Sequence, residues 1–88
     1  MQYGAEQVIL YGSYAQGRAG PNSDVDLLII AQTDEKFYQR MATVKGLIRD
    51  LRKGLAVSPL VLTKQELEKR IQIKDQFISG IIENGTKL

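Results

Sequence analysis

Two short apolar runs on either side of a glycine-rich segment constrain the fold of this chain most strongly. The first, residues 8–11, ends at Gly12, and the second, residues 24–31, is rich in Val, Leu and Ile. Runs of this length bounded by turn residues are typical of buried strands. Between them, residues 13–19 can form one or two helical turns with the serine as N-cap, and residues 20–23 are loop-forming. We therefore predict two strands joined by a short helix and a loop.

The segment from about residue 36 to residue 53 has a helical period. Its apolar residues recur at spacings of three and four and are Phe37, Met41, Val44, Ile48 and Leu51. Such a stripe predicts an amphipathic helix whose apolar face belongs to the core, and Gly54 is a natural end for it.

The remaining sequence predicts a third strand and a C-terminal helical segment. Residues 55–62 form a strand-like run, in which Pro59 indicates an edge position or a local distortion. Residues 63–66 have the form of a capping box and should begin a helix. Its apolar stripe, with a break near residues 74–75 and an end at Gly85, comprises Leu67, Ile71, Ile78 and Ile82.

This order of elements predicts an α+β fold, with a small mixed β-sheet and helices packed on it. The length of 88 residues permits one domain, residues 1–88, with one small core.

Composition narrows the chemistry that the chain can perform. It contains neither cysteine nor histidine, which excludes disulfides, thiolate metal sites and histidine bases and leaves carboxylates as metal ligands. No apolar run approaches the roughly 20 residues of a membrane span, and no secretory leader begins the chain. We therefore expect a cytoplasmic protein without a membrane partner.

The net charge of +2 is unevenly distributed, because the first half of the chain is acidic and the second half is basic. This arrangement suits a metal site beside a surface for an anionic partner, although solvated helix faces give the same count. Lys45, Arg49 and Arg52 would share one helix face. No aromatic residues are interleaved for base stacking, so a solvated face is favoured and a nucleic-acid partner is not expected.

The candidate site lies between Gly12 and Asp26. Asp24 and Asp26 are two residues apart on a predicted strand, so their carboxylates would share one face about 7 Å apart along the chain. Two such carboxylates repel each other unless a proton or a cation intervenes, and Mg2+ prefers oxygen ligands. Upstream, Gly12 lets the backbone approach a ligand, and the hydroxyl of Ser13 adds a donor for a phosphate.

These residues carry a resemblance to a known family. Gly12-Ser13, ten intervening residues and Asp24-Val25-Asp26 resemble the signature of the polymerase-beta-like nucleotidyltransferase superfamily, and the string VILYGSYAQGRAGPNSDVDLLII resembles its minimal nucleotidyltransferase (MNT) branch. The resemblance implies that Gly12 and Ser13 bind the triphosphate of a nucleotide. It also implies that the catalytic residues Asp24 and Asp26 bind Mg2+ while a nucleoside monophosphate, favoured to be AMP from ATP, moves to a hydroxyl.

The MNT branch also implies a partner. Its members are often paired with a HEPN-type helical protein in toxin–antitoxin modules, in which the nucleotidyltransferase is the antitoxin and can add AMP to the toxin. Association of the chain with copies of itself is a further possibility.

Two departures from the family pattern leave alternatives open. Active members have a third carboxylate on the strand at residues 55–62, whereas Ser58 or Pro59 occupies that position here. Glu66 could substitute through a water, or the chain could be a weakly active antitoxin that works by direct contact with a helical partner. Relatives also usually carry a helix before the first strand, but only seven residues precede Val8, so either the chain is truncated or another surface covers the sheet.

Overall fold

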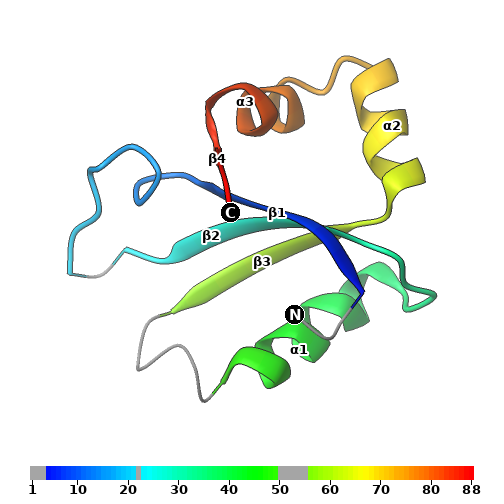
Figure 1. Cartoon of the computed structure of the whole chain (residues 1–88), viewed down its shortest axis with the longest axis horizontal. Helices are drawn as coiled ribbons and strands as arrows, with labels where there is room; N and C mark the ends of the chain where they lie inside the picture. Colours follow the sequence, from blue (N-terminus) through cyan, green and yellow to red (C-terminus); the bar gives the residue numbers. More distant parts are fainter. Residues whose placement is uncertain (1–3, 22, 50–55) are drawn as a thin grey trace.

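The computed structural model describes residues 4–21, 23–49 and 56–88. A sheet lies between helix α1 on one face and helices α2 and α3 on the other (Figure 1). In chain order the elements are β1 (Ala5–Tyr11), β2 (Val25–Ala31), α1 (Phe37–Ile48), β3 (Val57–Leu62), α2 (Lys64–Gln72), α3 (Gln76–Asn84) and β4 (Thr86–Lys87).

The sheet is mixed and has the strand order β3-β2-β1-β4. Strand β2 is parallel to β3 and antiparallel to β1, and the short β4 is antiparallel to β1. The predicted α+β class with a small mixed sheet is confirmed. Pro59 lies in the edge strand β3, as its missing N–H predicts, whereas the two residues of β4 gave no strand signal.

The position of β2 in the sheet explains why its sequence is continuously apolar from Leu27 to Ala31. Leu28 and Ile30 pack with α3 on one face, and Ile29 and Ala31 pack with α1 on the other, so the strand is buried on both sides. Because side chains alternate along a strand, Asp24 and Asp26 are in phase with Leu28 and Ile30 and belong to the face that carries α2 and α3.

The apolar stripe predicted for the long helix is wrong at its first two positions. Val44 is fully buried and Ile48 packs against the same cluster, but Phe37 and Met41 are 49% and 40% exposed. The buried side chain of this first part of α1 is instead Arg40, which reaches the end of β3 and donates to the carbonyl of Val61. Burial here follows a tertiary hydrogen bond rather than the helical period.

The end predicted for this helix falls on residues that the structure does not describe. Helix α1 ends at Ile48, and the positions of Leu51 and Gly54 lie outside the described residues.

Of the one or two helical turns predicted after the first strand, the structure has little more than one and no regular helix. Residues 12–17 form hydrogen-bonded turns, with one helical bond from the N–H of Gln16 to the carbonyl of Gly12. Gly12 and Gly17 both have positive φ values, of 76° and 69°. The segment therefore begins and ends on a left-handed residue, which limits it to little more than one turn.

The caps and the break of the C-terminal helical segment follow its local signals, whereas Ile71 of its predicted apolar stripe is 47% exposed. The Thr63 side chain accepts from the N–H of Glu66, whose carboxylate accepts in return from the N–H of Thr63, so the predicted capping box is confirmed. Lys74, with φ of 59°, separates α2 from α3, and Asp75 caps the second helix. Within the described ranges, no helix has the length and apolar character needed to cross a membrane.

Candidate active site

The two predicted acids lie at the end of the sheet where β2 begins. Asp26 is paired in register with Tyr11 of β1 on one side and with Ser58 of β3 on the other. Register partners present their side chains on the same face of a sheet. Tyr11, Asp26 and Ser58 therefore form one row on the face of α2 and α3, and Asp24 lies one step beyond Asp26 on the same face.

Contacts between these side chains confirm that the row is compact. The hydroxyl of Ser58 donates to Oδ2 of Asp24 over 3.4 Å, a long hydrogen bond in an exposed position. Asp24 is exposed and Asp26 is partly buried. Both carboxylates can thus be reached from solvent, while only Asp26 is partly enclosed by the fold.

Burial and a neighbouring carboxylate both disfavour the charged form of Asp26. Burial, followed by the negative charge of Asp24, raises the pKa of Asp26 above its ordinary value. The pKa of Tyr11 is also raised, by burial and then by the charge of Asp26. The fold therefore holds two mutually repelling carboxylates together, an arrangement that a bound cation would relieve.

Gly12 lies directly against this pair. A Cβ atom on Gly12 would be 2.4 Å from Oδ2 of Asp26, and the φ of 76° is itself unfavourable for any side chain. The residue that follows, Ser13, is partly buried, and its carbonyl accepts from the N–H of Arg18 over 2.9 Å. The structure therefore brings the turn backbone and the Asp26 carboxylate together, as the spacing in the sequence predicts.

The donors at this end of the sheet fit a hard cation that also binds a substrate. Among residues 4–21, 23–49 and 56–88, no cluster of three or more acidic, histidine or cysteine side chains could hold a metal ion. Two carboxylates at the beginning of β2 nevertheless suit Mg2+. This ion commonly binds one or two protein carboxylates and completes its octahedral coordination with waters and substrate phosphates.

Glu66 does not reach this site. It forms an ion pair with Nη1 of Arg40 at 2.5 Å and caps α2, at the far end of β3. Asp26 is level with Ser58 and Ile30 with Leu62, so about four residues, or about 13 Å, separate Ser58 from the end of the strand. The expectation that Glu66 could replace the third carboxylate is wrong. Strands β2 and β3 are parallel and both begin at the acids, so Glu66, which follows the end of β3, lies at the opposite end of the sheet.

The sequence also suggested a possible role for four other charged side chains, Arg18, Lys45, Arg49 and Arg52. Arg18 is exposed and donates to the side chain of Gln16, and Lys45 and Arg49 are exposed on the α1 side of the sheet. Arg52 is outside the described residues.

Tyr11 belongs to the candidate site, although the sequence did not single it out. Tyr11 is next to Asp26 and packs edge-on against Phe77 of α3, with ring centroids 5.9 Å apart. Its place at the end of the first strand, immediately before Gly12, was the available signal. Of the other tyrosines, Tyr14 is partly buried, Tyr38 is 70% exposed and Tyr3 lies outside the described residues.

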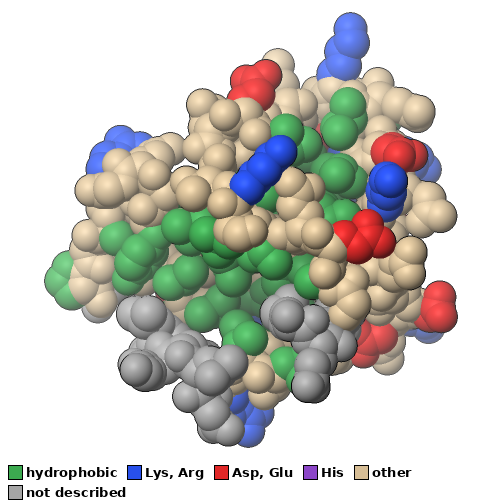
Figure 2. Space-filling model, in the orientation of Figure 1, with side chains coloured by type: hydrophobic (Ala, Val, Ile, Leu, Met, Phe, Trp, Pro, Cys, Tyr) green, Lys and Arg blue, Asp and Glu red, His purple; other side chains and the backbone are tan. Residues whose placement is uncertain are grey.

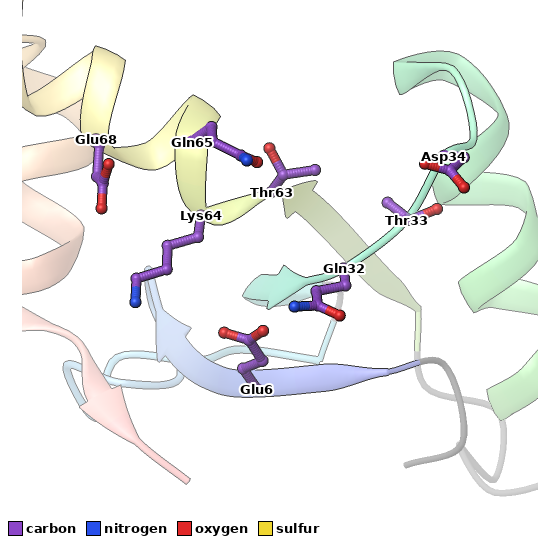
Figure 3. Close-up of a pocket in the computed structure, with 8 residues that line it drawn as sticks. All are labelled: Glu6, Gln32, Thr33, Asp34, Thr63, Lys64, Gln65 and Glu68. Atoms are coloured by element: carbon purple, nitrogen blue, oxygen red, sulfur yellow. The ribbon is translucent and has the colours of Figure 1, made fainter.

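A separate polar cavity of about 740 Å³ lies at the opposite end of the sheet (Figure 3). Gln32, which directly follows β2, lines it together with Glu6, Asp34 and Lys64. Figure 3 shows these side chains coming from the loop after β2, from β1 and from the beginning of α2. The cavity is therefore distinct from the acid pair, because it lies at the end of β2, whereas Asp24 and Asp26 lie at its beginning.

Comparison with known proteins assigns the chain to a family. The family model described as "Nucleotidyltransferase domain" matches residues 2–88. No solved structure matches the chain. With this match over nearly the whole sequence, the chain belongs to the nucleotidyltransferase domain family.

Three relatives from Methanocaldococcus jannaschii carry the name "Putative protein adenylyltransferase". MJ1305 is 35% identical over 78 residues, which are 85% of this chain and 52% of that protein. MJ0141 and MJ0604 are each 30% identical, over 94% of this chain and 78% and 77% of their own lengths. The chain thus spans about half of the first relative and about three quarters of the other two.

Proposed function

We propose that residues 1–88 form a nucleotidyltransferase domain that transfers AMP from ATP to a hydroxyl group. The observation that carries this proposal is the contact between the Gly12 backbone and the Asp26 carboxylate, with Asp24 beside it. A triphosphate bound at this turn would have its phosphates adjacent to both acids. No other pair of acids among the described residues is so placed beside a left-handed glycine.

Each residue has a defined part in this proposal. The backbone of Gly12 and the hydroxyl of Ser13 bind the β and γ phosphates, because a glycine turn allows close approach and exposes N–H donors. Asp24 and Asp26 are the catalytic residues and would hold Mg2+. When bound, Mg2+ would supply positive charge that neutralises the phosphates, activates the attacking hydroxyl and stabilises the departing pyrophosphate.

The balanced reaction follows from this arrangement. The acceptor oxygen forms a bond to the α-phosphorus of ATP, the bond from that phosphorus to the β-phosphate oxygen breaks, and pyrophosphate leaves. The acceptor's proton passes to a base or to solvent. The residues that flank the acids would orient the triphosphate for in-line attack, which is where most of the acceleration in such transfers arises.

We further propose that the acceptor belongs to a protein partner of HEPN type, that the chain acts as its antitoxin and that the pair is cytoplasmic. The relatives' name, protein adenylyltransferase, supports a protein acceptor. The surface of α1 supports a partner, since Phe37, Tyr38, Met41 and Leu47 are exposed large hydrophobic side chains. Figure 2 also shows hydrophobic side chains gathered across the middle of one face, over the strands between α1 and α3.

One observation favours a second candidate function. Ser58 occupies the position level with Asp26 where active family members are expected to have a carboxylate, so general-base help is missing there. A chain with low activity could neutralise its partner by contact alone. In that case the complex, rather than the modification, is the functional product.

The test uses ATP labelled on either the α or the γ phosphate, with the chain co-expressed with a HEPN-type partner. We expect Mg2+-dependent label transfer from α-labelled ATP only, and its loss in Asp24→Asn and Asp26→Asn. Asp34→Asn, an exposed acid at the other end of β2, is the matched control and should behave as the unchanged protein. Transfer of the γ label, or full activity in both site variants, would refute the proposal.

The same variants separate the two candidate functions. If partner neutralisation persists unchanged in Asp24→Asn and Asp26→Asn while labelling is absent throughout, contact is the mechanism. If neutralisation is lost together with labelling, transfer is the mechanism.

A further inference from the structure

A cleft of about 340 Å³ adjoins the candidate active site on the side of α3. Tyr11, Gly12 and Gln16 line it from the end of β1 and the following turn, and Phe77, Gly80 and Asn84 line it from α3. Gly12 contributes to both places, because it also contacts the carboxylate of Asp26. The cleft is therefore continuous with the point at which the proposed function locates the phosphates.

The chemistry of the cleft differs from that of the acids. All of its lining residues are uncharged, whereas the adjoining site has two carboxylates. Gln16 and Asn84 are exposed amides, each able to donate and to accept hydrogen bonds. A flat, neutral group with polar edges matches this lining better than an anion or a charged peptide does.

Phe77 provides an aromatic surface in this cleft. Its side chain is 59% exposed, although it is large and apolar, and it meets Tyr11 at an interplanar angle of 86°. The edge contact orients the ring while leaving much of it accessible. Exposed aromatic rings held in this way are typical platforms for stacking a nucleobase.

Gly80 keeps the cleft open. It lies in the middle of α3, where glycine costs about 1 kcal/mol relative to alanine. No atom lies within 4 Å of the position that its Cβ would occupy, so packing within the fold does not require glycine there. The space in front of this residue is available to a ligand.

We propose that the cleft binds the nucleoside part of the triphosphate, with its base stacked on Phe77 and lying over Gly80. This inference rests on the proposed function, because it extends the same ligand from the phosphates at Gly12 into the neighbouring cleft. The neutral base and ribose occupy the uncharged cleft, and the amides of Gln16 and Asn84 bind the polar edges. The minimal domain thus has a base-binding surface of its own.

The experiment compares Gly80→Leu with Gly46→Leu, using Mg2+-ATP and inorganic tripolyphosphate with Mg2+ as ligands in calorimetric titrations. Gly46 is the matched control, since it lies within α1 on the opposite face of the sheet and its Cβ would likewise meet no atom within 4 Å. We expect Gly80→Leu to weaken ATP binding at least about tenfold, the scale of one base–aromatic stack. Tripolyphosphate binding should be unchanged, and Gly46→Leu should affect neither ligand.

A second variant, Phe77→Leu, keeps an apolar side chain but removes the ring, and it should also weaken ATP binding while sparing tripolyphosphate. Far-ultraviolet circular dichroism verifies that each variant keeps its helices. Unchanged ATP affinity in both variants, or equal loss of both ligands in a folded variant, would overturn the inference. If the unaltered protein binds tripolyphosphate but gains no affinity from the nucleoside, the inference fails and the proposed function stands. If it binds neither ligand, both fail.

Discussion

The position of Gly12 requires both a left-handed backbone and close approach to a carboxylate, and only glycine satisfies both requirements. Gly12→Ala would have to relieve a 2.4 Å approach to Oδ2 of Asp26 and also adopt a φ of 76°. We expect a loss of stability of about 1–2 kcal/mol from the backbone alone and at least a tenfold loss of Mg2+-ATP affinity from displacement of the acid. Urea unfolding and calorimetric titration measure the two effects.

Gly17→Ala is the matched control for this substitution. Its φ is 69°, but its Cβ would meet no atom within 4 Å. It should cost similar stability and leave nucleotide affinity unchanged. Equal losses of affinity in both variants would show that backbone strain, and not contact with Asp26, determines binding.

Asp26 illustrates how a functional residue reduces stability. Its folded-state pKa is raised from the ordinary value of 3.8, so the folded protein holds this proton more tightly than the unfolded chain. Ionisation therefore lowers stability as pH rises above about 3.8 through the folded-state pKa. Asp26→Asn should be more stable than the unchanged protein at pH 7 without Mg2+, by less than about 1 kcal/mol because the pair is partly solvated.

The measurement is urea unfolding of both proteins from acid to neutral pH. The stability difference attributable to this ionisation should disappear below the ordinary pKa of 3.8, where both forms are uncharged. We expect the stability of Asp26→Asn relative to the unchanged protein to increase from acid to neutral pH. A decrease over the same range would contradict the proposed repulsion with Asp24.

At the scale of elements, β3 determines what stands beside the acids. Ser58 is level with Asp26 and its hydroxyl donates to Asp24, so Ser58→Asp would introduce a third carboxylate into the same row. We expect the transfer rate to rise at least about tenfold, since a positioned general base contributes roughly 10²–10⁴-fold. Stability without Mg2+ should fall because a third negative charge joins the pair.

Ser58→Asn is the control, because it has nearly the same shape as aspartate without the charge. Label transfer from α-labelled ATP measures the rates of both variants. An equal rise in the asparagine variant would attribute the effect to size, and no rise in the aspartate variant would mean that β3 does not supply the acceptor's base.

The contact between α1 and α2 is a structural ion pair at the other end of the sheet. Arg40 is 6% exposed, and it donates to the carbonyls of Glu35 and Val61 as well as to Glu66. Glu66→Gln would remove the carboxylate that is ion-paired with the buried guanidinium of Arg40. We expect a loss of about 1–2 kcal/mol, less than for a fully buried pair because the Glu66 side chain is 40% exposed.

The pH dependence of this pair has the opposite sign to that of Asp26. The hydrogen bond from Arg40 is the first cause that lowers the pKa of Glu66 below the ordinary 4.5. Its stabilisation is present above pH 4.5 and is lost as pH falls through the folded-state pKa. Glu66→Gln should lack this acid-dependent component while keeping transfer activity per folded molecule, and loss of activity in a folded variant would instead give Glu66 a direct part in the reaction.

For the molecule as a whole, the parallel pairing of β2 and β3 separates structural from chemical residues. Both strands begin at the acid pair and run towards the Arg40–Glu66 ion pair, with α1 on one face and α2 and α3 on the other (Figure 1). At the acidic end Asp24 is exposed and Asp26 is only partly buried, so both acids remain accessible. A substitution at the ion pair, such as Glu66→Gln, should therefore alter stability without altering the chemistry at the acid pair.

Local signals in the sequence were sufficient for most of the elements. The apolar runs, the capping box at Thr63 and the break at Lys74 follow from hydrogen bonds and backbone preferences among neighbouring residues, and the structure confirms them. The two-residue strand β4 gave no such signal. In the turn after β1, two left-handed glycines, at positions 12 and 17, limit the helical part to little more than one turn. The glycines are visible in the sequence, but their φ values are not.

The sequence by itself determined the family, the α+β class and the phase of Asp24 and Asp26, because spacing along a strand fixes which side chains share a face. The sequence left Ser58 or Pro59 as the residue beside them, and only the tertiary structure decided between the two. The register of β3 puts Ser58, and not Glu66, beside the acids, and the reach of Arg40 to β3 replaces Phe37 and Met41 in the core. Such outcomes depend on pairing between strands and on contacts distant in sequence, for which a local period carries no information.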